Sequence, residues 1–98
     1  MAFSVKIVNH QRNRMLNICD VDLVGRTLVE SDFKMNLTPS YFSERVVDEK
    51  EAEQLLLHSS IINMVGEKTI ALSVKLGVGS PKGVKKINGV PFLLVFKF

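Results

Sequence analysis

The sequence has no tryptophan, one tyrosine and one cysteine, and each of these shortages narrows the range of functions. A single cysteine excludes an internal disulfide and fits a reducing compartment better than a secreted scaffold. Little aromatic surface is expected for stacking nucleic-acid bases. The longest strongly apolar run, residues 92–96, is far too short to cross a bilayer, and the N-terminal residues lack the apolar core of a signal peptide. We therefore predict a cytoplasmic protein that does not enter a membrane.

Motifs for metals and cofactors are also missing. His10 and His58 are the only histidines, they lie far apart, and no cysteine or histidine pair has the spacing of zinc ligands. The glycines form neither a dinucleotide fingerprint nor a P-loop. Cys19 lies in an apolar strand, where a buried and inert thiol is expected, with a Cys19–histidine dyad as the open alternative. We predict no metal, no cofactor and no catalytic residue, so the sequence leans away from an enzyme.

What is present indicates a globular chain. The 98 residues are 46% hydrophobic, which is typical of one small folded domain and not of a disordered segment, and we predict a single domain over residues 1–98. The formal net charge of +3 is mild. It permits an anionic partner without requiring one.

Apolar periodicity predicts a mixture of strands and helices. Strands are expected over residues 3–8, 15–19, 33–37 and 60–65, helices over 48–58 and 67–77, and a terminal hairpin over 84–98 with its turn at Asn88-Gly89. Residues 9–13 are expected to form a five-residue hairpin loop. The predicted fold class is α+β, with a mixed or mostly antiparallel sheet, two main helices and a C-terminal β-hairpin.

Two aspartates have the positions of helix caps. Asp20 is expected to cap a short helical turn that runs to Val24. Asp48 and Glu51 have the spacing of a capping box at the start of the helix over 48–58.

The stretch from Ser59 to Gly77 predicts a strand, a glycine turn and a helix in direct succession. Backbone N–H groups at the start of such a helix can hold an anion, although Glu67 would repel one, and a glycine that only turns the chain is the simpler interpretation. Asn63 stands in an otherwise apolar strand, where it either satisfies a buried neighbour or projects into a site. The candidate residues for a small anionic ligand are Arg26, Asn63, Gly66, Glu67 and Lys68.

Basic residues fall into two groups, which are candidates for nucleic-acid binding. Arg12 and Arg14 lie on the first predicted loop, and Lys82, Lys85 and Lys86 lie before the last hairpin. If the two groups meet in space, they form a patch that can follow a phosphate backbone. Two solvated loops are the alternative.

The last strand, Phe92–Phe98, carries apolar residues on both faces. Such a strand is either covered on both sides or presents an apolar face to a partner. It therefore predicts a homodimer or another protein interface as the alternative to an RNA-binding surface.

Taken in order, these stretches resemble a small archaeal family of uncharacterised conserved proteins, domain of unknown function four-twenty-four. The resemblance rests on residues 18–28, 41–42, 46–56, 59–78 and 87–91. Two departures stand out: Ser43-Glu44 replaces a usual glycine pair, and Phe92-Leu93-Leu94 replaces a usual His-Ala-Gln. Any role of that histidine in relatives is therefore lost in this chain.

The resemblance implies an archaeal cytoplasmic protein and supplies no activity. Together with the basic groups, it favours a non-catalytic binding module that contacts RNA or a ribonucleoprotein. The alternatives are a protein-interaction or homodimerisation module using Phe92–Phe98, and a binder of, or enzyme on, a small anionic ligand at the Gly66 turn.

Overall fold

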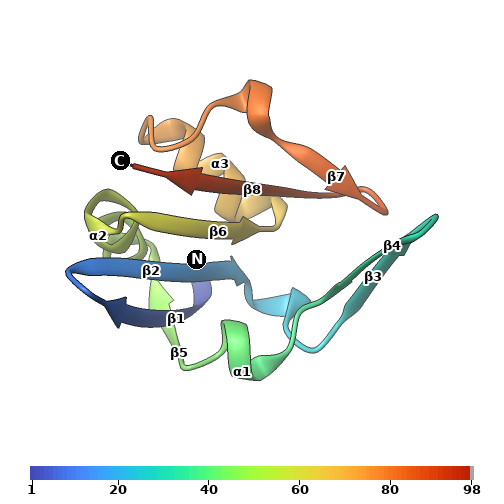
Figure 1. The fold of residues 1–98 in the computed structure, drawn as a ribbon, viewed down its shortest axis with the longest axis horizontal. Coiled ribbons are helices and arrows are strands. Elements are labelled where there is room, and N and C mark those ends of the chain that lie inside the picture. The colour runs from blue at the N-terminus through green and yellow to red at the C-terminus, as the bar shows by residue number, and fades with distance from the viewer. Residues whose placement is uncertain (98) are drawn as a thin grey trace.

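The computed structural model describes residues 1–97. Its main feature is a six-stranded mixed sheet in the order β5-β1-β2-β6-β8-β7, beside a separate two-stranded sheet, β3-β4 (Figure 1). The strands are β1 Ala2–His10, β2 Asn13–Asp20, β3 Thr27–Glu30, β4 Phe33–Asn36, β5 Arg45–Asp48, β6 Ile61–Val65, β7 Lys85–Ile87 and β8 Val90–Phe96. The helices are η1 Val21–Leu23, α1 Pro39–Phe42, α2 Glu49–His58, α3 Glu67–Lys75 and η2 Pro81–Gly83. The predicted α+β class, the two main helices and the terminal hairpin are confirmed.

Pairing in the large sheet is antiparallel except between β2 and β6, which run parallel. A parallel pair needs a long crossover, and the chain between these strands contains β3, β4, α1, β5 and α2. The crossover places α2 on one face of the sheet, where α3 joins it. Both helices bury an apolar stripe there.

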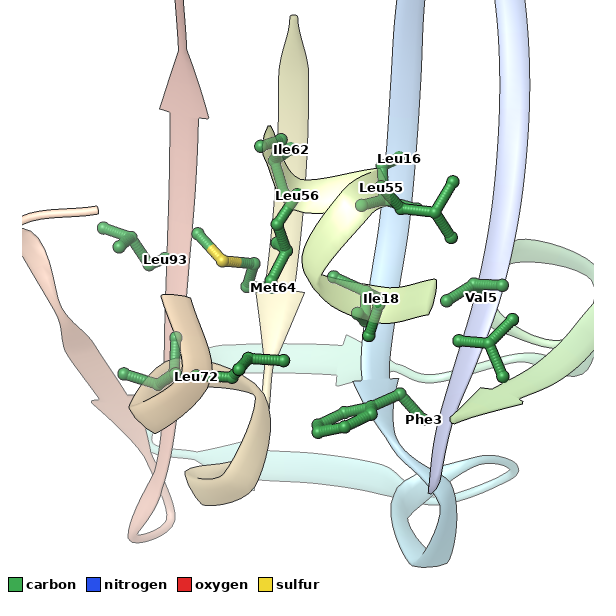
Figure 2. Close-up of a cluster of buried hydrophobic side chains, with 13 residues drawn as sticks. Phe3, Val5, Leu16, Ile18, Leu55, Leu56, Ile62, Met64, Leu72 and Leu93 are labelled. Atoms are coloured by element: carbon green, nitrogen blue, oxygen red, sulfur yellow. The ribbon is translucent and has the colours of Figure 1, made fainter. Parts of the chain in front are cut away.

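The larger core lies between these helices and the sheet (Figure 2). Alternate residues of each strand point to this face because the side-chain period of a strand is two. The strands contribute Phe3 and Val5 of β1, Ile18 of β2, Met64 of β6 and Leu93 of β8. The helices cover them with Leu56 and Leu72.

A smaller core lies on the opposite face, under β3, β4 and α1. It includes Leu28, Leu37 and Phe42, which pack against Cys19 and Val65 of the sheet. Two buried polar side chains fasten this layer: Ser4 Oγ donates to the carbonyl of Phe42 at 2.5 Å, and Asn17 Nδ2 donates to the carbonyl of Tyr41 at 3.1 Å. The layer covers only part of that face.

Two local predictions are wrong. The first hairpin turns at Gln11 and Arg12 and not over five residues, because the polar residues 9–10 and 13–14 continue the backbone ladder. Asp20 precedes η1 but makes no side-chain cap to it, since its carboxylate accepts from Thr69 at the start of α3.

The turn of the last hairpin agrees with its prediction. At Asn88 and Gly89 both φ angles are positive, as the predicted type of hairpin turn requires.

Candidate functional site

The junction between the end of β2 and the start of α3 is built around Asp20. Its carboxylate accepts from the backbone N–H groups of Lys68 (3.1 Å) and Thr69 (2.9 Å) and from Thr69 Oγ1 (2.8 Å). Asp20 is buried, and Thr69 is fully enclosed. A carboxylate from a neighbouring strand therefore caps α3, and it complements the positive end of the helix.

Gly66 makes this cap sterically feasible. Its φ is 112°, a conformation that favours glycine, and a β-carbon at this position would overlap the carboxylate of Asp20. Its N–H donates to the carbonyl of Pro91 at 2.9 Å. The glycine therefore permits close contact with β2 while tying the turn to β8.

A hollow of about 210 Å³ opens beside this junction. Glu67 and Lys68 line it together with Gly89 and Pro91, so the Gly66 turn and the last hairpin do converge. Its charged groups are the carboxylates of Asp20, Asp22 and Glu67 and the ammonium of Lys68. The carboxylates outnumber the ammonium group, and Asp20 already accepts from two backbone N–H groups at the start of α3. These surroundings therefore disfavour an anion.

Two other predicted ligand residues lie away from this hollow. Arg26 is exposed after η1, where its backbone N–H donates to the carbonyl of Leu23 and its carbonyl accepts from Leu37. Asn63 is half-buried in the middle of β6, paired with Asn17 and Leu94. Neither residue lines the hollow.

The two groups of basic residues do not meet. Arg12 and Arg14 lie at the β1–β2 turn, and Lys85 and Lys86 lie on β7 at the opposite end and edge of the sheet (Figure 1). Strand spacing and register separate the groups by roughly 20 Å. Lys82 is exposed in η2. Arg12 and Arg14 border one hollow, and Lys85 and Lys86 border a separate groove.

The lysines of β7 border a groove of about 470 Å³ between β7 and the β3–β4 hairpin. Phe33 and Met35 line it from β4, and Ile87 and Phe92 line it from the last hairpin. Phe33 is 73% exposed, and Phe92 is half-buried.

Lys34, Lys85 and Lys86 also line the groove. Lys85 is the direct partner of Phe92 and shares its face of the sheet, whereas Lys34 alternates with Phe33 and Met35, and Lys86 alternates with Lys85 and Ile87. The one carboxylate among the lining residues, Glu30, accepts a hydrogen bond from the backbone N–H of Asn88 at 2.7 Å. The sequence contains few aromatic residues, but the fold brings Phe33 and Phe92 to one groove that three lysine residues also line. The alternation of apolar and polar residues in β4 predicted a strand, but it gave no indication that β7 lies beside it.

The arginines of the β1–β2 turn border a second hollow, of about 550 Å³. Both histidines line it: His10 from the end of β1 and His58 from the end of α2. They are 48 positions apart in the sequence, and they come together because α2 lies over β1 and β2. No pattern in the sequence indicated this cluster.

Cys19 is fully buried, as predicted. Burial, together with the carboxylates of Asp20 and Asp22, raises the pKa of its thiol to about 12. The thiol is therefore protonated at neutral pH, which matches the predicted inert role. Within residues 1–97, no three histidine, cysteine, aspartate or glutamate side chains gather as metal ligands.

The uncovered part of the second sheet face carries an apolar row. Val8, Met15, Ile61 and Phe96 are direct neighbours in the ladders of β1, β2, β6 and β8. Leu94 lies on the same face beside them and is 53% exposed. The predicted interface strand thus presents one apolar face to solvent, while Phe98 lies outside the described residues.

These features define a class: a small α+β protein with helices on one face of a mixed sheet, one groove and one hollow bordered by basic residues, and an aspartate-capped junction between β2 and α3. Its family follows from the sequence. The sequence model of the family described as a protein of unknown function (DUF424) matches residues 8–98, and the chain belongs to that family.

A solved structure has the same fold. The crystal structure of an uncharacterized conserved protein from Methanopyrus kandleri matches with a TM-score of 0.81 and 19% identity, covering 100% of this chain and 93% of that one. A comparison with curated proteins found no match. Among residues 1–97, the longest helices fall well short of the length and hydropathy needed to span a membrane.

Proposed function

We propose that this protein is a non-catalytic module that binds single-stranded RNA in the groove between β7 and the β3–β4 hairpin. The observation that carries the proposal is the lining of that groove, where Phe33 and Phe92 lie among Lys34, Lys85 and Lys86. Single-stranded nucleic acid is bound by aromatic side chains that stack on bases and by cations that pair with phosphates. The groove supplies both kinds of contact.

Duplex RNA suits the groove less well than a single strand. Paired bases keep their faces stacked within the helix, so Phe33 and Phe92 could not reach them. A single strand can turn its bases toward the apolar floor while its phosphates remain at the lysines. The proposal therefore includes a preference for unpaired RNA.

Fluorescence anisotropy with a labelled 12-nucleotide uridine RNA tests the proposal at 50 and 200 mM salt. Three phosphate contacts correspond to a slope near −2 in log affinity against log salt, so binding should weaken by about twentyfold between these concentrations. The Lys85→Glu/Lys86→Glu variant should abolish binding. The Lys50→Glu/Lys75→Glu variant has the same net charge but changes lysines on α2 and α3, and it should keep most of the affinity.

Two results would contradict RNA binding in the groove. One is the absence of binding at 50 mM salt. The other is equal weakening by both double variants, which would indicate a general charge effect and not a site. Tight binding of an acidic peptide in place of RNA would assign the same groove to a protein partner.

The apolar row on the sheet supports a second candidate, self-association. Val8, Met15 and Leu94 are exposed on the uncovered face, and burying such side chains stabilises a dimer. Light scattering between 10 and 500 µM should then show a mass that rises toward twice the monomer, and Leu94→Glu should restore the monomer. A constant monomer mass for the unaltered protein would exclude this candidate.

A small anion at the Gly66 turn is the weakest of the three functions. Asp20 already accepts from the amides of Lys68 and Thr69, and carboxylates dominate the adjoining hollow. For this reason the turn serves better as a structural junction than as an anion site.

A further inference from the structure

The hollow beside the β1–β2 turn concentrates positive and proton-donating groups in one place. Arg12, Arg14, His10 and His58 line it, and no carboxylate is among its eight described lining residues. The other lining groups are three amide side chains and the hydroxyl of Ser60. A surface hollow made only of donors and neutral polar groups is suited to an anion.

Register places Arg14 on the side of the sheet that α2 covers, while His10, the partner of Asn13, belongs to the other face of the ladder and also lines the hollow. Arg14 lies two residues before Leu16, whose side chain is in the core under the helices. Because side chains two positions apart in a strand share a face, Arg14 lies on the helix side of the sheet, as does its direct partner on β1, Asn9. The last turn of α2 crosses the same end of the sheet and brings His58 there. The backbone N–H of Ser60 donates to the carbonyl of Arg14 at 2.9 Å and fixes α2's end against β2.

The C-terminal end of a helix carries partial negative charge, which would oppose an anion. Two of the last four carbonyls of α2, those of Leu56 and Leu57, already accept hydrogen bonds. His58 Nδ1 lies 2.8 Å from the carbonyl of Gln54, and Lys97 Nζ donates to the carbonyls of Leu56 (2.6 Å) and Leu57 (3.2 Å). The contact with Gln54 uses Nδ1 as the donor, because a carbonyl can only accept, and leaves Nε2 of His58 for another partner.

The turn itself holds an unusual conformation. Gln11 and Arg12 have φ angles of 47° and 73°, in the left-handed region that hairpin turns of this type usually fill with asparagine and glycine. A glutamine and an arginine are less favourable there than glycine. The sequence therefore retains a guanidinium at the tip of the hairpin at the expense of turn stability.

We propose that this hollow binds a phosphate monoester carried on a small polyhydroxyl group, such as a sugar phosphate. Two guanidinium forks and the imidazole of His58 match the several oxygens of a terminal phosphate. The volume leaves room for more than a phosphate, and Ser60 and the amides suit hydroxyl groups. An extended polyanion fits less well, since the lysines of β7 lie roughly 20 Å away.

The test is a titration of the ¹⁵N-labelled protein, followed by NMR at constant ionic strength, with inorganic phosphate, ribose 5-phosphate and ribose. Ribose 5-phosphate should give saturable shifts confined to residues 9–14 and 58–60. It should bind at least fivefold more tightly than inorganic phosphate, and ribose should give no shifts. Equal affinity for inorganic phosphate and ribose 5-phosphate would indicate a simple phosphate site. It would overturn the part of the proposal that concerns the polyhydroxyl group.

The variant Arg12→Gly separates binding from folding. Glycine suits the left-handed conformation of residue 12, so the urea midpoint should rise. At the same time the affinity for ribose 5-phosphate should fall at least fivefold. A variant that is more stable yet binds less well cannot have lost affinity through misfolding.

Lys50→Gln removes the same charge from the first turn of α2, at the other end of that helix from His58, and serves as the matched control. It should change the affinity for ribose 5-phosphate by less than twofold. The proposal is overturned if no saturable shifts appear up to 50 mM ligand, if the shifts spread over the whole surface, or if Arg12→Gly and Lys50→Gln weaken binding equally.

Discussion

At the scale of single residues, Asp20 joins β2 to α3, because its buried carboxylate accepts three hydrogen bonds from Lys68 and Thr69. The variant Asp20→Ala leaves the N–H groups of Lys68 and Thr69 without an acceptor, and the free energy of unfolding should fall by about 2–4 kcal/mol. Urea denaturation measures this loss. Asp22→Ala removes an exposed carboxylate two residues away and should change stability by less than about 0.5 kcal/mol. Similar losses in both variants would show that charge, and not the cap, matters.

Cys19 supplies a pH-dependent prediction. The pKa of its thiol is about 12 in the folded protein against 9.0 for an ordinary cysteine, so between these values the folded state holds a proton that the unfolded state has lost. The free energy of unfolding should therefore be unaffected by this thiol below pH 9 and fall above it, by up to about 1.4 kcal/mol per pH unit.

Urea denaturation of the unaltered protein and of Cys19→Ala, at intervals from pH 7 to pH 10.5, isolates this effect. The small cavity in the variant lowers stability equally at every pH, whereas the thiol contributes only above pH 9. The stability difference between the two proteins should thus be constant at first and then shift in favour of the variant. Parallel curves throughout the range would contradict a shifted thiol.

The same residues show what sequence reasoning can reach at this scale. The burial of Cys19 followed from its apolar neighbours, because local pattern decides which face a strand residue occupies. The role of Asp20 did not follow, since its partners lie 48 and 49 positions along the chain. A local cap was the nearest explanation for its carboxylate, and a tertiary contact took its place. Gly66 carried the only usable signal, as a glycine where a helix begins.

At the scale of elements, α2 shows how far local signals extend. Asp48 Oδ1 accepts from the backbone N–H of Glu51 at 2.8 Å, and Val47 and Ala52 are both buried beside this cap. Asp48→Ala should lower the free energy of unfolding by about 1 kcal/mol, measured by urea denaturation. Glu49→Ala removes a neighbouring carboxylate but leaves the cap intact. It should lower the free energy of unfolding by only a few tenths of a kcal/mol. Equal effects of the two would assign the stabilisation to the helix dipole alone.

Elements without such signals were missed. β3 and β5 are four residues long, and each buries only one side chain, Leu28 in β3 and Val47 in β5. Neither shows the alternation that marks a half-buried strand. β5 pairs with β1, which lies far away in the chain, whereas β3 pairs with β4 directly across the turn at residues 31–32. Each of these short strands depends on pairing with its partner, and the residues of the strand alone do not show that pairing.

At the scale of the whole molecule, both proposed binding regions depend on arrangement and not on motif. The groove needs the β3–β4 hairpin to lie against β7, and the hollow needs α2 to end over the β1–β2 turn. The sequence contained all of the basic residues, but the strand order decided which of them are neighbours. For that reason the two basic groups, which would form one patch only if they met, lie apart in the fold.

The two cores predict unequal stability across the molecule. The β3–β4 hairpin is two-stranded, rests mainly on Leu28 and Leu37, and leaves Val29 and Phe33 exposed. A two-stranded hairpin is marginally stable by itself, whereas β2 and β6 are paired on both edges and buried under α2 and α3. We expect the hairpin to open without unfolding the rest.

Native-state hydrogen exchange tests this expectation. Amides of residues 27–36 that are bonded within the hairpin should exchange at least tenfold faster than those of β2 and β6, equivalent to an opening free energy lower by about 1.4 kcal/mol. Their exchange should also depend weakly on urea, because a local opening exposes little surface. The amides of β2 and β6 should follow global unfolding. If the hairpin amides instead share the free energy and urea dependence of β2 and β6, the two layers unfold as one unit, and the groove is as rigid as the main core.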